Sequence, residues 1–322
     1  MPQLSLKQRY QIEAMKRLGY GVSDIARRYD MAKSTVSREL RRNSKNGRYD
    51  AERAQKMSRG RRRRGPTKLN GALLQKVEAM LNLRHSPEQI SGRLEQQGEA
   101  SVSHEAIYQH VYRDRAKGGS LYTNLRFARK KRRKRLSVRQ KRGQIPNKTM
   151  IAQRPAEVEN RERFGDWEGD TIVGGAHQGV VVTLVERKSK YTVAAKAGDK
   201  SAAAVEKVVV ELLQNAPLPT RTITFDNGTE FSNHQKISET LNATVYFANP
   251  YHSWERGLNE NTNGLIRQFI PKKQNLKELD ESYLKAVQEN LNNRPRKTLG
   301  FLSPIEFFNT FPQITQPVAF ET

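Results

Sequence analysis

Two stretches decide the fold of this chain: Trp-Glu-Gly-Asp-Thr-Ile-Val at 167–173 and Thr-Ile-Thr-Phe-Asp at 222–226. Both alternate between two kinds of side chain, which is typical of β-strands with one polar face. In the first stretch the alternation places Glu168 and Asp170 on the same face. In the second it buries the apolar residues and leaves Asp226 on the polar face with two threonines. Each predicted strand therefore presents an aspartate on its polar face.

The elements around these two strands follow a recognisable order. Alternating and helical patterns predict strands at 167–173, 179–187, 191–196, 222–226 and 244–248, and helices at 201–215, at 232–242 and from near 253. The order βββαβαβα is that of an α/β ribonuclease-H-like fold, in which three antiparallel strands are extended by parallel ones with helices on both faces. If strands one and four are neighbours, as that fold requires, Asp170 and Asp226 meet near the sheet centre.

A third carboxylate, Glu260, belongs to the last predicted helix. Arg267 follows it by seven residues and falls within about 20° of the same helical face, with Asn263 close by. Glu255 is a rival, but it lies about 140° away around that helix, so the two glutamates cannot face one site together. We expect Glu260 to approach the two aspartates.

The three carboxylates Asp170, Asp226 and Glu260 are the candidate catalytic and metal-binding residues. Two carboxylates about 4 Å apart repel by roughly 4 kcal/mol at an effective dielectric near 20, so three cannot stay ionised together without cations. The chain has no cysteine and no paired histidines, which favours Mg²⁺ or Mn²⁺. Two such ions can activate a water or a 3′-hydroxyl and stabilise the leaving oxygen of a phosphodiester.

Three further residues are expected to support this site. Glu168 shares the face of Asp170, and Asn227 with Gly228 would let the chain turn sharply after Asp226. Taken alone, an aspartate at a strand end is more often a turn residue than a metal ligand. The agreement of strand order, side-chain face and three acids favours the metal site.

The charge of the chain indicates a polyanionic partner. Its 322 residues carry a formal net charge of +25, with an isoelectric point of about 10.3. For a chain without a run of 18 apolar residues or an apolar signal region, nucleic acid is a likelier partner than a membrane. The absence of cysteine is typical of the reducing cytoplasm.

Residues 1–45 are predicted to form a helix-turn-helix domain, with helices at 5–18, 23–29 and 34–42. The last helix is polar and basic on its outer face and would enter the major groove of DNA. The alternative is an ordinary three-helix bundle with a solvated charged face. The candidate DNA-binding residues of this helix are Ser34, Thr35, Ser37, Arg38, Arg41 and Arg42.

Two basic segments are predicted to be linkers, at 46–70 and 117–158. Dense like charges repel each other in water and are relieved against a phosphate backbone, so we expect both segments to lie along DNA. A solvated tail is the alternative for the second. Their candidate DNA-binding residues are Arg61, Arg62, Arg63, Arg64, Arg129, Lys130, Lys131, Arg132 and Arg133.

Between the linkers, 71–116 repeats the helical pattern loosely and is predicted to be a second helix-turn-helix domain, with His104 and Tyr108 as candidate DNA contacts. The catalytic domain is predicted at 159–275 and a helical extension at 276–322. In the extension, Arg294, Arg296 and Lys297 either pack against the sheet domain or contact DNA.

Four motifs resemble one known family. They are Trp-Glu-Gly-Asp at 167–170, Phe-Asp-Asn-Gly-x-Glu-Phe at 225–231, Ser-Trp-Glu-Arg-Gly-x-Asn-Glu-Asn-x-Asn-Gly-Leu-x-Arg-Gln-Phe at 253–269, and Asn-x-Arg-Pro-Arg-Lys-x-Leu-Gly-Phe at 292–301. The chain resembles the bacterial insertion-sequence transposases of the IS-thirty family, within the Asp-Asp-Glu transposase and retroviral integrase superfamily. The 33 residues between Asp226 and Glu260, the basic Arg267 and the tandem helix-turn-helix units match that family.

The resemblance implies a transposase that binds double-stranded DNA at the terminal inverted repeats, cleaves strands and directs a 3′-hydroxyl at a target phosphodiester. It implies a homodimer or higher homo-oligomer on DNA, in the bacterial cytoplasm with the nucleoid. The zinc module of retroviral integrases does not carry over, because the chain lacks cysteine. Two other functions stay open: a sequence-specific DNA-binding regulator with an inert core, and a structure-selective nuclease of the same fold.

Overall fold

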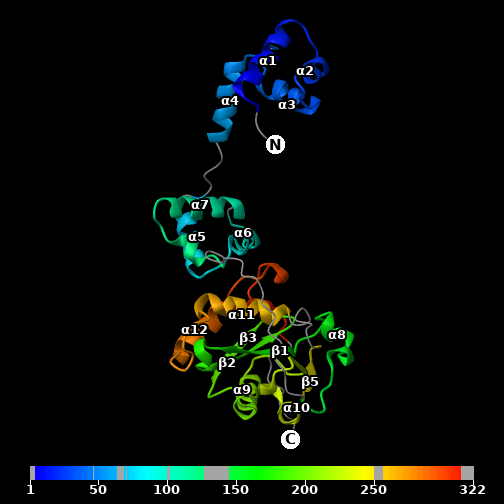
Figure 1. The fold of residues 1–322 in the computed structure, drawn as a ribbon, viewed down its shortest axis with the longest axis vertical. Helices are drawn as coiled ribbons and strands as arrows, with labels where there is room; N and C mark the ends of the chain where they lie inside the picture. Colours follow the sequence, from blue (N-terminus) through cyan, green and yellow to red (C-terminus); the bar gives the residue numbers. More distant parts are fainter. Residues whose placement is uncertain are drawn as a thin grey trace. The chain divides into compact units, whose positions relative to one another are not determined.

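The computed structural model describes residues 4–45, 47–63, 69, 71–99, 102–126, 145–249 and 257–312. They belong to two units, Met1–Asn70 and Gly71–Thr322 (Figure 1). Glu255, Arg64 and the predicted DNA contacts from Arg129 to Arg133 lie outside the described residues.

The first unit is helical, as predicted. Its helices are α1 (Leu6–Arg17), α2 (Val22–Arg28), α3 (Lys33–Asn43) and α4 (Ala51–Arg63). Ser5 caps α1 in a capping box with Gln8, which satisfies backbone N–H groups that the first turn leaves without partners. Ile12, Ile25 and Val36 are fully buried where the first three helices meet.

The prediction of a linker at 46–70 is wrong for α4, which packs against α1. Ala51 and Ala54 are fully buried and Ser58 nearly so, at a spacing that puts all three on one helical face. The Glu13 carboxylate accepts a hydrogen bond from the backbone N–H of Ala51 at 3.0 Å. Small residues give no strong apolar pattern, yet they allow two helices to approach closely.

The second unit begins with three helices, α5 (Gly71–Asn82), α6 (Pro87–Gln96) and α7 (His104–Ala116). Ser86 and Gln89 form the capping box of α6, with proline at its first position. Short 3-10 helices follow along the chain: η1 (Leu121–Asn124), η2 (Ile151–Gln153), η3 (Gly175–His177), η4 (Thr229–Phe231) and η6 (Lys297–Leu299).

A five-stranded mixed sheet forms the centre of this unit, and it confirms the predicted fold class. Its strands are β1 (Asp166–Val173), β2 (Val180–Glu186), β3 (Thr192–Ala197), β4 (Thr222–Phe225) and β5 (Thr244–Phe247). The order is β3-β2-β1-β4-β5. Strand β1 pairs antiparallel with β2 and parallel with β4, so β1 and β4 are neighbours, as the fold requires.

Helices cover both faces of the sheet (Figure 1). On one face lie α9 (Ala202–Gln214) and α10 (His234–Leu241), and on the other lie α11 (Gly257–Phe269) and α12 (Glu281–Asn292). Alternation along β1 divides its side chains: Trp167 joins the cluster of α9, while Ile172 joins the cluster of α11 and α12. The even-numbered face of β1 therefore looks toward α11.

The prediction that all of 117–158 is a linker is also wrong for its last part. Ile145 belongs to the core of the sheet domain, and the backbone N–H of Phe247 donates to the carbonyl of Thr149 at 2.9 Å. Val158, in the short helix α8 (Ala156–Glu159), is fully buried. The charge run upstream hides this apolar segment in the sequence.

The C-terminal extension is helical where it is described, with α12 followed by η6 and α13 (Pro304–Asn309). It packs against the sheet domain, since α12 contacts β3 and Phe308 is part of the core. Among the described residues, no helix is long and apolar enough to cross a lipid bilayer.

Candidate active site

Asp170 lies in the middle of β1, and Asp226 directly follows the end of the adjacent strand β4. The parallel register pairs Asp166 with Thr222 and Glu168 with Thr224. Continued by two residues, this offset places Asp226 level with Asp170 on the same face. Both side chains are half-buried. The sequence prediction that the two aspartates share a polar face agrees with this placement.

Two glycines make room beside the two aspartates. A Cβ atom on Gly169 would lie 2.3 Å from the Phe225 ring, so glycine lets that ring pack under β1. A Cβ atom on Gly228 would lie 2.5 Å from a Glu230 carboxylate oxygen and 2.9 Å from an Asp226 oxygen. The φ angle of Gly228 is −73°, so this glycine provides space rather than the unusual backbone angle expected of a sharp turn.

Helix α11 is joined to β1 by three side-chain hydrogen bonds in succession. The Glu168 carboxylate accepts from the backbone N–H of Asn259 at 3.4 Å. Asn263 donates to Asp170 at 2.7 Å. Arg267 donates to the carbonyl of Val173 at 2.7 Å. Asn259, Asn263 and Arg267 follow one another at intervals of four residues, which keeps them on one face of the helix. Four residues of a helix rise roughly 6 Å, about as far as two residues of a strand, so the helix and the strand stay in step.

The amide of Asn263 is oriented by a second hydrogen bond. Its carbonyl oxygen accepts from the Thr183 hydroxyl at 3.0 Å, which leaves its NH₂ group directed at Asp170. Thr183 lies on β2, directly opposite Asp170 in the antiparallel pairing. Sequence analysis missed Thr183, although the register of β1 and β2 could have indicated it.

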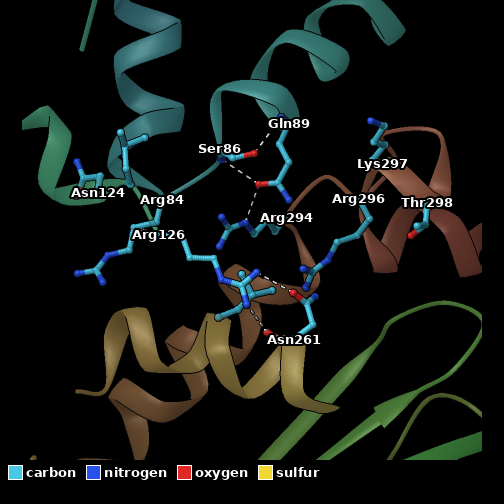
Figure 2. Close-up of a pocket in the computed structure, with 12 residues that line it drawn as sticks. Arg84, Ser86, Gln89, Asn124, Arg126, Asn261, Arg294, Arg296, Lys297 and Thr298 are labelled. Carbon is cyan, nitrogen blue, oxygen red and sulfur yellow. Dashed lines mark hydrogen bonds between the residues drawn. The ribbon is translucent and has the colours of Figure 1, made fainter. Parts of the chain in front are cut away.

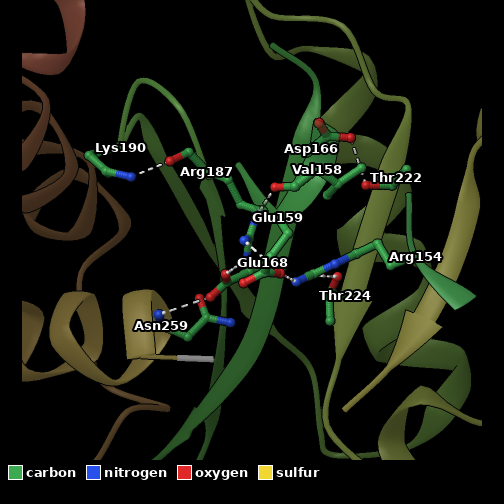
Figure 3. Close-up of polar contacts among 10 residues, drawn as sticks. All are labelled: Arg154, Val158, Glu159, Asp166, Glu168, Arg187, Lys190, Thr222, Thr224 and Asn259. Carbon is green, nitrogen blue, oxygen red and sulfur yellow. Dashed lines mark hydrogen bonds and ion pairs between the residues drawn. The ribbon is translucent and has the colours of Figure 1, made fainter. Parts of the chain in front are cut away.

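Glu168 lies in a buried polar network rather than at the surface (Figure 3). It forms an ion pair with Arg187, which also contacts Glu159 at 3.4 Å and donates to the carbonyl of Val158 at 3.1 Å. Both Glu168 and Arg187 are at most 2% exposed. A carboxylate at the first turn of a helix also interacts favourably with the helix dipole. Glu168 thus holds the start of α11.

Glu260 projects from this first turn of α11 and is exposed. Its charge acts on Arg126: burial lowers the pKa of Arg126, and the Glu260 carboxylate opposes that shift. Within the described part of the chain, no three His, Cys, Asp or Glu side chains form a group that could hold a metal ion. Asp170 and Asp226 lie on neighbouring strands, but with Glu260 they do not form a closed metal site among the described residues.

Among the described residues, a buried amide in the first turn of α11 has no hydrogen-bond partner. Asn259 is 1% exposed, and the statement holds for both of its side-chain polar atoms. A buried polar group without a partner is costly, and no contact within the described residues offsets that cost here.

Asn227 ties the end of β4 to its surroundings. It donates to the carbonyl of Ala248 at 2.6 Å and accepts from Lys148 at 2.6 Å. Lys148 thus places a cation on Asn227, the residue that follows Asp226 in the sequence. It was not among the predicted site residues, because it falls in the predicted linker. Glu230, also missed, is buried near Gly228 and accepts from Thr171 at 2.9 Å.

The predicted groove-reading residues lie mainly on the outer face of α3. Ser34, Ser37, Arg38, Arg41 and Arg42 are exposed, whereas Thr35 is half-buried. In α7, His104 is exposed and Tyr108 is half-buried. The centre of the Tyr108 ring lies 6.0 Å from that of the Tyr112 ring, and the two rings are stacked. For Arg61, Arg62 and Arg63, only the helical backbone lies within the described part of the structure.

Two family models match the chain. A helix-turn-helix domain model matches residues 2–43, and an integrase core domain model matches residues 160–253. The first contains α1 to α3, and the second contains both Asp170 and Asp226.

Relatives match nearly the whole chain. The transposase for insertion sequence element IS4351 of Bacteroides fragilis is 42% identical, over 94% of this chain and 94% of that protein. The transposase for IS1086 of Cupriavidus metallidurans is 39% identical, over 94% and 93%. Transposase InsI for IS30A of Escherichia coli (strain K12) is 35% identical, over 94% and 82%.

Among solved structures, the catalytic core domain of BIV integrase is 19% identical and covers 46% of this chain and 96% of that chain, with a TM-score of 0.36. At this TM-score the overlap adds nothing to the fold established by the strand order.

Proposed function

We propose, from the premise that this chain belongs to the IS30 (IS-thirty) family of insertion-sequence transposases, that it cuts and joins DNA strands with Asp170, Asp226 and Glu260 as metal ligands. The chain is a DNA transposase and a polynucleotidyl transferase, with a helix-turn-helix domain for DNA binding. The observation that supports the proposal is the parallel register of β1 and β4, which, continued by two residues, pairs Asp170 with Asp226.

The side chains present suit divalent cations. Proteins with an integrase core generally use such ions, and the proposed ligands offer only carboxylate oxygens, which Mg²⁺ and Mn²⁺ prefer. When bound, a pair of these ions would lower the pKa of the attacking water or 3′-hydroxyl and offset charge on the leaving oxygen. The choice of ion and the number of two per site are part of the proposal.

Residues of the chain position these ligands. Asn263 holds one oxygen of Asp170 and Arg267 ties the second half of α11 to β1, whereas the contact of Glu168 with the first turn is longer, at 3.4 Å. We expect the first turn of α11 to move when DNA and metal bind, bringing Glu260 to the aspartates. Two observations support such a shift: Glu260 is exposed, and the neighbouring Asn259 amide is buried without a hydrogen-bond partner in the described residues.

The DNA substrate is proposed to be the pair of terminal inverted repeats of the element. The exposed Ser37, Arg38 and Arg41 of α3 can contact base edges and phosphates. Because two ends must be joined to one target, we propose that the enzyme acts as a homodimer or higher homo-oligomer. Light scattering of the DNA complex measures that state, and a complex with a single copy would contradict it.

Strand transfer by three matched variants tests the proposal. Asp170→Asn, Asp226→Asn and Glu260→Gln should each reduce Mg²⁺-dependent strand transfer of a labelled element end by at least about 1,000-fold, since each removes a ligand charge where transition-state charge develops. Binding of the same end should change less than about threefold. Glu239→Gln, an exposed change on α10, is the control and should keep full activity.

Full strand transfer in any of the three variants would refute the assignment of that residue. The same assay separates the other functions. An inert DNA-binding regulator would bind the end without nicking it, and a structure-selective nuclease would cut DNA regardless of the terminal sequence.

A further inference from the structure

A pocket with a volume of about 230 Å³ lies beside the first turn of α11 (Figure 2). Its walls come from four parts of the second unit: the junction of α5 and α6, the segment after η1, helix α11 and the loop between α12 and η6. The lining cations are Arg84, Arg126, Arg294, Arg296 and Lys297, and we call this site the arginine pocket.

The lining of the arginine pocket is strongly positive. Five of its twelve lining residues are Lys or Arg, and none of the twelve is acidic. At its rim Lys297 pairs with Glu88 at 2.6 Å. Arg294 has neutral partners, donating to Gln89 at 2.9 Å and Gln268 at 3.0 Å.

The two deepest arginines are buried as cations. Arg294 is 2% exposed and Arg296 is 8% exposed. Arg296 donates to the carbonyl of Leu291 at 3.1 Å, while its Nε has no hydrogen-bond partner in the part of the chain that the structure describes. Burial of charge normally requires an opposite charge nearby, so these groups are suited to an anion that enters the pocket.

The protonation behaviour of these residues agrees with this picture. Burial, followed by the charges of neighbouring arginines, lowers the pKa of Arg294 to about 9, and burial together with Arg126 lowers that of Arg296 to about 10. An anion would remove this repulsion. Guanidinium groups also match phosphate oxygens with two parallel N–H donors, in shorter and stronger hydrogen bonds than neutral pairs form.

The position of the pocket identifies the source of the anion. Arg126 donates to the Asn261 side chain at 2.7 Å, and Asn261 directly follows Glu260 in α11. The charge of Glu260 also acts on Arg126, so an arginine that lines the pocket is within electrostatic reach of the proposed catalytic glutamate. On a DNA transposase, the anion that must lie near that residue is the DNA backbone.

We propose that the arginine pocket binds a backbone phosphate of the DNA strand that is cut, next to the scissile phosphate. This inference rests on the proposed function of Glu260. The bound phosphate would fix the strand relative to the first turn of α11, so that DNA entry and the placement of Glu260 occur together.

Single neutral phosphates test this site. A set of element-end duplexes, each carrying one methylphosphonate near the cleavage site, is bound by the full-length protein without metal and then assayed for strand transfer with Mg²⁺. For the wild type, one or two positions should weaken binding roughly 10-fold, as expected for loss of a charge-assisted hydrogen bond.

Lys297→Gln and Arg294→Gln should bind unmodified DNA roughly 10-fold more weakly than the wild type does. A methylphosphonate at the positions that weaken wild-type binding should then cause no further loss of affinity in these two variants. The side chain of Lys297 is 68% exposed, so Lys297→Gln decides the outcome if Arg294→Gln does not fold. The control is Arg93→Gln, which removes a cation of α6 that pairs with Glu306 outside the pocket and should keep the wild-type pattern.

If the pocket variants lose affinity at the same methylphosphonate positions as the wild type, the inference is overturned. A wild-type protein that binds with the expected pattern but transfers no strand would refute the proposed function and leave the phosphate site standing. Weaker binding of both variants with equal losses at every methylphosphonate position would show only general attraction of DNA, and would also overturn the site.

Discussion

Single side chains between β1 and α11 decide where Glu260 can lie. Asn263 connects Thr183, on β2, to Asp170, and Glu168 connects buried Arg187 to the backbone of Asn259. Each link joins the sheet to the same helix. Their shared effect is to hold α11 parallel to the strand that carries Asp170.

Glu168→Gln should weaken both stability and catalysis. The change keeps the size of the side chain but leaves Arg187 buried with Glu159, at 3.4 Å, as its carboxylate partner. Loss of one member of a buried pair costs about 3 kcal/mol of unfolding free energy. The start of α11 also loses its carboxylate, so the Mg²⁺ concentration for half-maximal strand transfer should rise about 10-fold.

Urea unfolding and an Mg²⁺ titration of strand transfer measure these two effects. Glu159→Gln is the matched control, because it removes a partner of Arg187 without touching α11; it should change stability alone. An unchanged Mg²⁺ requirement in Glu168→Gln would show that Glu168 is structural only.

For single residues, the sequence predicts the face of a strand on which a side chain lies better than it predicts which residues that side chain contacts. Alternation was sufficient to put Glu168, Asp170 and Asp226 on polar faces. It could not show that Glu168 is buried with Arg187, since a salt bridge over 19 residues depends on how two strands meet. Lys148 was missed because its neighbours in the sequence are dominated by a charge run.

At the scale of elements, the junction of α5 and α6 contains a buried neutral histidine. His85 is 7% exposed. Burial, and then the positive charges of Arg294, Arg296 and Arg93, lower its pKa from 6.5 to about 3. Protonation inside the folded protein would add a charge beside three cations.

Stability should therefore fall as the pH drops below 6.5. The unfolded chain takes up a proton at His85 near pH 6.5, whereas the folded protein does so only near pH 3, so acid favours unfolding in this window. The free energy of unfolding should decrease by about 2 kcal/mol more between pH 7 and pH 5 in the wild type than in His85→Gln. Urea unfolding followed by circular dichroism measures this difference, and equal decreases in both proteins would contradict it.

The elements that sequence analysis missed share one cause. Helix α4 buries Ala51, Ala54 and Ser58, which give little hydrophobic periodicity, and it ends in a run of arginines. The segment from Ile145 to Val158 follows another charge run. Long apolar elements such as α9 and β2 were predicted within a few residues, because their burial requires a strong pattern.

At the scale of the whole second unit, strand order was predictable and distant contacts were not. The order βββαβαβα limits the sheet to few topologies, and this placed β1 beside β4. Contacts such as Arg93 with Glu306 and Arg294 with Gln89 join residues more than 200 apart. The second contact lies in the arginine pocket and the first outside it, and nothing in the local sequence predicts either.

The central claim is that Asp170, Asp226 and Glu260 hold the catalytic cations, and localised radical cleavage tests it most directly. Fe²⁺ replaces Mg²⁺ in the complex of the full-length protein with an element end. Added hydrogen peroxide is reduced by the bound Fe²⁺ to hydroxide and a hydroxyl radical, ascorbate regenerates Fe²⁺, and the radicals cut the protein backbone next to the ion. We expect cuts in the middle of β1, after the end of β4 and at the start of α11, suppressed by excess Mg²⁺ and lost in Asp226→Asn. Cuts at other places, or the same cuts in Asp226→Asn, would contradict the account.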